Sequence, residues 1–225
     1  MRDVLREDRP YARYLTAQTF LGLSNLMVMA VQTILVTREV DDWGGNVYWI
    51  CTVLFVAIPR LLTFASLRQW GGLFDRVGVL RFRVINCWFW SAAAALGLVG
   101  ELAITYSDRL GPAAPVLMLA CFGLQAVAYG FGMGGGKVAW SIGHLHFAGG
   151  AKGDLYMGIH VTLTGVRGTV ATLLGVYVWS LMGWGVWLVA LGFMSTATLL
   201  FLRLARQDGG ETAPKPAASS LSASR

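Results

Sequence analysis

Charged side chains are scarce in this 225-residue sequence. Asp, Glu, Lys and Arg together make up 13% of the residues, whereas hydrophobic residues make up 56%. A soluble domain with this balance would leave large apolar patches on its surface. The 18 basic residues outnumber the 12 acidic ones, but they lie mainly between long apolar runs. The composition therefore predicts a lipid bilayer as the chain's main partner, and it does not predict a nucleic-acid partner.

Cysteine is also scarce, and motifs for covalent chemistry are missing. Cys51, Cys87 and Cys121 each fall inside an apolar run, and neither disulfide nor metal-ligand spacing is visible. The sequence contains no P-loop, no nucleophile motif and no zinc pattern. We therefore expect no enzyme, no catalytic residue, no metal and no cofactor.

Long apolar runs are abundant and predict membrane-spanning helices. Runs of about 20 residues suit a hydrocarbon core of about 30 Å, and lipid offers no partner for open backbone groups. The predicted fold is an all-α integral membrane domain over 1–206. Its six transmembrane helices are expected at 14–36, 47–68, 84–106, 113–135, 155–179 and 182–204. The first run is too long for a signal-peptide core, so we expect it to be retained. Residues 207–225, rich in Gly, Pro, Ala and Ser, predict a flexible tail.

The basic residues divide unequally between the two sides of these spans. Fourteen lie in the terminal segments and in the connections after the second and fourth spans. Only Arg38 and Arg109 lie in the other connections, and Arg60 and Arg167 lie within spans. The positive-inside rule then predicts that both termini are cytoplasmic.

Polar residues inside the spans form stripes. Gln18, Asn25 and Gln32 are seven residues apart, almost two helical turns, and so share one face of the first span. The other stripes comprise Arg60 and Thr63 in the second span, Gln125 and Tyr129 in the fourth, and His160, Thr164 and Arg167 in the fifth. The pattern predicts that these four spans face an interior, and that the third and sixth face lipid.

Two arginines and one glutamate inside spans are candidate functional residues. A charge at the bilayer centre costs at least about 2.5–3.5 kcal/mol on insertion scales, so such residues usually face water or a partner. Arg60 and Arg167 could bind an anionic substrate or form a coupling pair, or they could fix helix packing through an ion pair or carbonyl contacts. Glu101 could pair with Arg167 at similar depth.

Histidines and glycines leave further alternatives. His160 could carry a proton, because histidine changes charge near neutral pH, but it could equally be a packed hydrogen-bonding residue. His144 and His146 could ligate a metal or pigment, although an interfacial role is favoured because no third ligand is near. The glycines from Gly130 to Gly136 predict close helix packing.

The segment Trp70–Arg83 reads as a short polar loop between two apolar runs. Set against the pattern G-x-L-x-D-R-x-G, it provides Gly71, Gly72, Leu73, Phe74, Asp75, Arg76, Val77 and Gly78. This pattern resembles the cytoplasmic loop after the second helix of each half of major facilitator superfamily transporters. The resemblance implies that Asp75 and Arg76 join a charge cluster that gates the inner face. Basic residues usual in the family are replaced by Val79 and Leu80.

The fifth span, from Tyr156 to Gly168, also resembles segments of bacterial members of this superfamily. The chain is thus similar to a single six-helix half, more like the C-terminal half, because the fourth span lacks the arginine that proton-coupled members often carry. In that family, helices one, two, four and five of each half line the cavity. The resemblance implies a transport protein of the bacterial cytoplasmic membrane that needs a second half or a homodimer. The alternative is an accessory subunit of a larger respiratory or photosynthetic membrane complex.

Overall fold

A computed structural model describes residues 2–148 and 152–211, and within these ranges it contains helices and no strand. The helices are α1 (Arg2–Glu7), α2 (Arg9–Asp42), α3 (Val47–Thr52), the π-helical η1 (Val53–Ala57), α4 (Ile58–Thr105), α5 (Ser107–Leu110), α6 (Ala113–Ile142), α7 (Leu145–Ala148), α8 (Gly153–Met182) and α9 (Gly185–Glu211). The predicted all-α fold is confirmed. Of the predicted tail 207–225, the part up to Glu211 continues α9, and 212–225 lie outside the described residues.

Five helical stretches in the described part of the chain are long and apolar enough to cross a membrane. They are Arg9–Asp42, Val47–Thr105, Ala113–Ala148, Gly153–Met182 and Gly185–Asp208. The second stretch joins α3, η1 and α4 into 59 residues. At about 1.5 Å per residue it would be about 90 Å long if straight, roughly three hydrocarbon cores. It must therefore bend.

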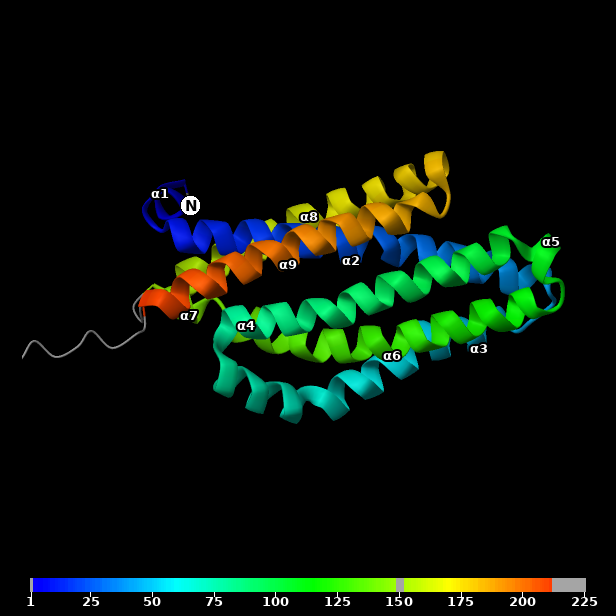
Figure 1. Ribbon diagram of the computed structural model, residues 1–225, viewed down its shortest axis with the longest axis horizontal. Coiled ribbons are helices and arrows are strands. Elements are labelled where there is room, and N and C mark those ends of the chain that lie inside the picture. Colours follow the sequence, from blue (N-terminus) through cyan, green and yellow to red (C-terminus); the bar gives the residue numbers. More distant parts are fainter. Residues whose placement is uncertain (1, 149–151, 212–225) are drawn as a thin grey trace, which may run out of the picture.

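The bend lies at Gly78, and it corrects the prediction of a loop from Trp70 to Arg83. This segment is helical on both sides, and only Gly78 leaves helical geometry, with φ 72° and ψ 167°. Figure 1 shows α4 running to one end of the molecule and returning from it. We refer to the residues before and after Gly78 as the first and second arms of α4. A region of φ and ψ open almost only to glycine thus replaces a loop.

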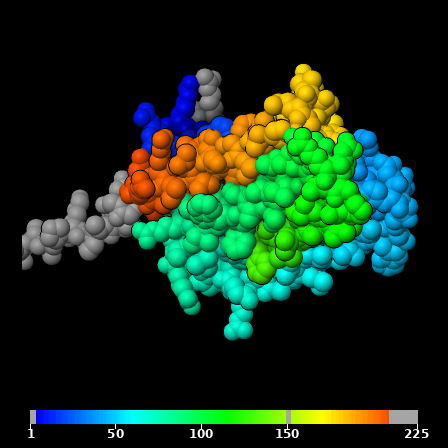
Figure 2. All heavy atoms as spheres, turned by 45° about the vertical axis from the view of Figure 1, so that its right-hand side comes forward, coloured from blue at the N-terminus to red at the C-terminus, as the bar shows by residue number. Residues whose placement is uncertain are grey.

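The helices pack in two groups. α2 contacts both α8 and α9, while α6 lies against the two arms of α4; contacts between α4 and α9 join the groups. Figure 2 shows α9 beside α4 on one face of the molecule. Glycines allow the closest approaches: a side chain at Gly175 of α8 would overlap the backbone of Met27 in α2. The glycines of α6 similarly meet Pro59, Ser66 and Trp90, as the close-packing interpretation expected.

The prediction that the third and sixth spans face lipid is wrong for one face of each. One face of the second arm of α4 is buried along its length. This face includes Arg83, Asn86, Cys87, Trp90, Ala94, Gly97 and Glu101. In α9, Val186, Trp187, Ala190 and Met194 are fully buried. In a helix bundle each long helix packs against neighbours, so even a mostly apolar helix covers a core face. Sequence polarity alone therefore misplaced these two helices.

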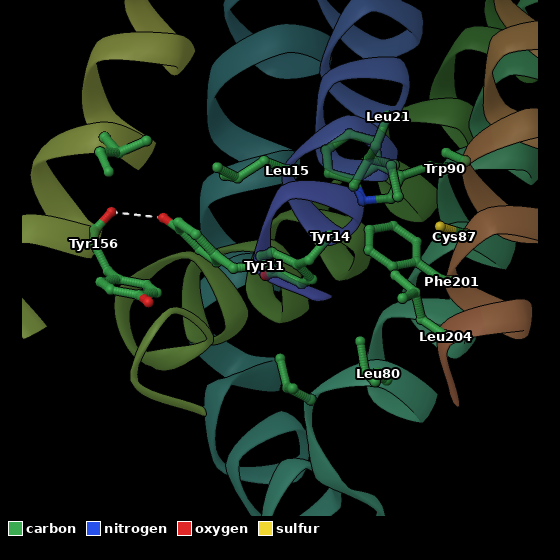
Figure 3. Close-up of a cluster of buried hydrophobic side chains, with 14 of the residues drawn as sticks. Tyr11, Tyr14, Leu15, Leu21, Leu80, Cys87, Trp90, Tyr156, Phe201 and Leu204 are labelled. Carbon is green, nitrogen blue, oxygen red and sulfur yellow. Dashed lines mark hydrogen bonds between the residues drawn. The ribbon is translucent and has the colours of Figure 1, made fainter. Parts of the chain in front are cut away.

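The two ends of the bundle are formed by different elements. Figure 1 shows the N terminus, the bend of α4, α7 and the end of α9 at one end, whereas α5 lies at the other. At the first end, Tyr11 and Tyr14 form a buried aromatic cluster with Tyr156 and Phe147. The Tyr11 hydroxyl donates to the backbone oxygen of Tyr156 over 2.7 Å (Figure 3). These contacts tie the start of α2 to the start of α8.

Candidate functional site

A cavity of about 340 Å³ lies between α2, α4, α6 and α8. Its lining comprises Gln18, Leu21, Gly22, Asn25 and Leu26 from α2, Arg83 and Trp90 from α4, Tyr129, Met133, Gly136, Lys137 and Trp140 from α6, and Thr164 and Arg167 from α8. The predicted stripes of the first, fourth and fifth spans therefore do meet. The third span contributes where the second was expected.

Arg167 reaches from α8 to α2. Its Nη1 donates to the backbone oxygen of Gln18 over 2.8 Å, and its Nη2 donates to Thr164 Oγ1 over 3.1 Å. The side chain lies over Gly22, where any Cβ would overlap the guanidinium group. The absence of a side chain at Gly22 thus makes room for Arg167. Of the alternatives predicted for Arg167, the carbonyl contact is present.

Arg83 is a cavity residue that the sequence interpretation missed, because it was counted among the loop bases. It is 1% exposed. Its Nε and Nη2 each donate to the Tyr14 hydroxyl over 3.4 Å, which is longer than a typical hydrogen bond. The spacing of Arg83, Asn86 and Trp90 at i, i+3 and i+7 places all three on one helical face, and this was the available signal.

The cavity lining holds three basic side chains and no acidic one. Among the described residues, no carboxylate lies within 4.0 Å of Arg83, Lys137 or Arg167. Gln18 Oε1 and Arg167 Nε are buried without a hydrogen-bond partner in this part of the chain. The electrostatics are therefore one-sided, with positive charge that no neighbouring acid offsets.

Arg60 lies on the surface of the first arm of α4 and does not contact Arg167 directly. It lines a second cavity of about 430 Å³, to which Thr63 and Phe64 also contribute. Tyr129, Met133 and Lys137 line both cavities. Arg60 and Arg167 thus line two neighbouring cavities that have these three α6 residues in common. Within the described ranges, no acidic residue lines the second cavity either.

Two further side-chain amides, one from α2 and one from α6, meet near the C-terminal end of α2. Gln125 Nε2 donates to Gln32 Oε1 over 2.7 Å, and both residues are buried. They line a smaller cavity of about 60 Å³. Asn25 lines the main cavity and a narrow space that also reaches Gln32. The predicted α2 stripe therefore lines three cavities that share some of their lining residues.

Glu101 does not pair with Arg167, so that expectation is wrong. One carboxylate oxygen accepts a hydrogen bond from Trp179 Nε1 over 2.7 Å, and the other accepts from Trp187 Nε1 over 2.5 Å. Glu101 is 5% exposed and Trp187 is fully buried. The carboxylate thus joins α4 to α8 and α9. Glu101 does not line the main cavity.

The histidines fall outside the cavity lining. His160 is 2% exposed, its ring lies 5.8 Å from that of Trp140, and its Nε2 has no hydrogen-bond partner among the described residues. His146 Nε2 lies 3.8 Å from Asp208 Oδ1. No group of three or more potential metal-ligating side chains is found in the described ranges.

The residues of the loop motif lie at the bend of α4. Asp75, Arg76 and Gly78 are exposed, and Gly71 is half-buried with open space around its Cα. Within the described ranges, neither Asp75 nor Arg76 makes an ion pair within 4.0 Å. Of this motif, only Gly78 has a role that its backbone geometry explains. Comparison of the chain with protein-family models, curated proteins and solved structures gives no match.

Proposed function

We propose that this chain is a transport protein of the major facilitator type, a six-span unit whose central cavity takes up a polar solute. The main cavity and its polar lining support this proposal. It is formed by helices that are distant in the chain, and it combines basic, amide and aromatic side chains. Such a mixture of an apolar wall with a few polar groups is typical of a small-molecule site.

The geometry of α4 supports six crossings. The 59-residue stretch reverses at Gly78. The part before Gly78, which includes α3 and η1, and the part after it are each long enough to cross a hydrocarbon core. The end of the bundle that carries both described chain ends also carries most of the bases, so the positive-inside rule favours a cytoplasmic location for it. The bacterial cytoplasmic membrane follows from the stated resemblance and stays a prediction.

A second membrane unit is part of this proposal. α8 is the least buried of the long helices, and Val166, Val170, Leu173 and Tyr177 are exposed on it. Arg167 is only half-buried beside that surface. A second copy, or another half-size unit, would shield this polar edge from lipid, where an unpaired charge is costly.

Purification in mild detergent followed by mass measurement tests the assembly. The transporter proposal predicts a species of two six-span units, made of this chain alone or with one similar partner. Recovery only within a large multi-subunit complex would instead support the accessory-subunit alternative. A monomer that is stable in both detergent and lipid discs would contradict the proposed second unit.

Reconstitution into liposomes tests transport itself. We expect the purified assembly to accumulate at least one labelled solute from a panel of neutral, cationic and anionic metabolites. Arg167→Leu should reduce this uptake while the assembly persists, because the variant removes a polar group from the cavity. Liposomes that take up no solute faster than protein-free ones would contradict the transport proposal.

A further inference from the structure

We propose that the main cavity binds an oxyanion, a phosphate group, between Arg83 and Arg167. This inference deepens the proposed function and rests on it for the ligand's role as transported solute. Binding itself follows from the cavity alone. Four observations carry the argument: the charge of the lining, the state of each arginine, the second cavity and the apolar walls.

The charge of the lining favours an anion over a cation or a neutral solute. Arg83, Lys137 and Arg167 line one cavity of about 340 Å³ without an acidic residue. Like charges that line one space repel one another, and this repulsion is reduced most effectively by an ion of opposite sign. A cation would add to the repulsion, and a neutral solute would leave it unchanged.

Arg83 uses only part of its hydrogen-bonding capacity. Both of its bonds go to one hydroxyl, that of Tyr14, at 3.4 Å, although a guanidinium group offers five N–H donors. A nearly fully buried guanidinium group normally pairs with a carboxylate or a comparable acceptor. Since none lies within 4.0 Å in the described ranges, an oxyanion from outside the chain is the missing partner.

Arg167 is positioned by its neighbours rather than neutralised by them. A backbone carbonyl and a threonine hydroxyl accept its hydrogen bonds, and Gly22 leaves space for the side chain. Both acceptors are uncharged, so they orient the guanidinium group without cancelling its charge. This arrangement suits recognition of an anion, because the positive group is already ordered before the ligand arrives.

The second cavity carries the same charge as the main cavity beside it. Arg60 and Lys137 line the second cavity, both are exposed, and Lys137 lines the main cavity as well. Positive charge from Arg60 and Lys137 therefore adds to the attraction of an anion toward Arg83 and Arg167. Trp90, Trp140 and Leu21 complete the walls of the main cavity, so a small organic anion with an apolar or ring portion fits better than a bare inorganic ion.

Two sources could supply this oxyanion: a soluble metabolite or the headgroup of an anionic phospholipid. Both present the same chemistry to the arginines. The experiment therefore uses three probes on the purified full chain in uncharged detergent. Inorganic phosphate and glycerol 3-phosphate represent the soluble source, and phosphatidylglycerol represents the lipid source. Native mass spectrometry measures stoichiometry, and thermal unfolding measures stabilisation.

We expect one probe to bind in a one-to-one ratio with each chain and to raise the unfolding temperature. Arg167→Gln should weaken that binding about tenfold, the effect of losing one charge-assisted contact. Arg203→Gln is the matched control, because Arg203 is exposed at the same end of the bundle and lines neither cavity. Arg167→Lys should restore part of the affinity by restoring the charge.

The outcomes separate this inference from the proposed function. Stabilisation by the soluble probes identifies a metabolite, and retention of phosphatidylglycerol alone identifies a bound lipid; each result supports the oxyanion site. Equal weakening by Arg167→Gln and Arg203→Gln, or no binding of any probe to the wild-type chain, would overturn it. Binding without transport leaves the site established and the transport proposal refuted, whereas transport of neutral solutes without anion binding refutes the site alone.

Discussion

At the residue scale, the charged side chains inside the helix bundle are of two kinds. Glu101 receives two indole N–H donors, one to each oxygen, and so both oxygens have a direct partner. Arg83 and Arg167 have no charged partner among the described residues. A buried charge with complete hydrogen bonding is compatible with a structural role, whereas one without it is a candidate for binding. This contrast assigns the carboxylate to packing and the arginines to the cavity.

The structural role of Glu101 predicts a large effect of its removal on stability. Glu101→Leu should lower the free energy of unfolding by about 1–3 kcal/mol for each indole N–H left unpaired in the protein. Trp187→Phe in the leucine background should cost less than it does in the wild type, because its donor has already lost the acceptor. Unfolding in detergent, followed by far-UV circular dichroism, measures both. Trp88→Phe, at a residue that is 67% exposed, serves as the control.

Sequence analysis identified part of the cavity at this scale. Gln18, Asn25 and Arg167 were predictable because polar residues interrupt apolar runs at helical spacing. Arg83 was not, because it adjoins a segment rich in arginine and was interpreted as an interfacial base. The partners of Glu101 were equally hidden, because nothing in the sequence indicates that Trp179 and Trp187 lie beside this carboxylate. These contacts depend on which helices pack against each other, and the periodicity of a single sequence does not specify the packing partners.

At the scale of elements, the bend of α4 shows how one residue can replace a loop. The motif that was predicted as a polar connection is helical almost throughout, and the reversal depends on Gly78 with φ 72°. Sequence reasoning located the reversal correctly but not its form. The helix propensity of Leu73, Phe74 and Arg76 carries the helix up to the glycine, so no extended loop is needed.

Substitution at Gly78 should therefore be costly even though there is room for a side chain. A Cβ at this position meets nothing within 4 Å, so the cost of Gly78→Ala is conformational, about 1–3 kcal/mol. Gly72→Ala is the matched control: it lies in the same helix, is equally open, and has helical geometry. Its substitution should be neutral or stabilising. Equal midpoints of denaturant unfolding for the two variants would contradict the role of Gly78 in the bend of α4.

At the scale of the whole molecule, the main cavity lies between two helix groups. α2 and α8 provide one wall of the main cavity, and the second arm of α4 with α6 provides the other. The all-helical fold and its long apolar helices were predictable from hydropathy, because lipid requires helices of a set length. Their arrangement was not, because small residues such as Gly175 and Gly97 decide which helices approach closely, and their partners lie far away in the sequence.

The arrangement in space makes a direct prediction about sidedness. In a Cys51→Ser background, single cysteines at Asp42, Arg76 and Asp108 would probe three exposed positions, while Cys87 and Cys121 stay buried. Because α4 reverses at Gly78, Arg76→Cys should react with a membrane-impermeant maleimide only from the cytoplasmic side. Asp42→Cys and Asp108→Cys should react only from the opposite side. Labelling of positions 76 and 108 from one side would mean that the second arm of α4 does not cross the membrane. The inverse of the expected pattern at all three positions would preserve six crossings but place the arginine-rich end outside, against the charge distribution.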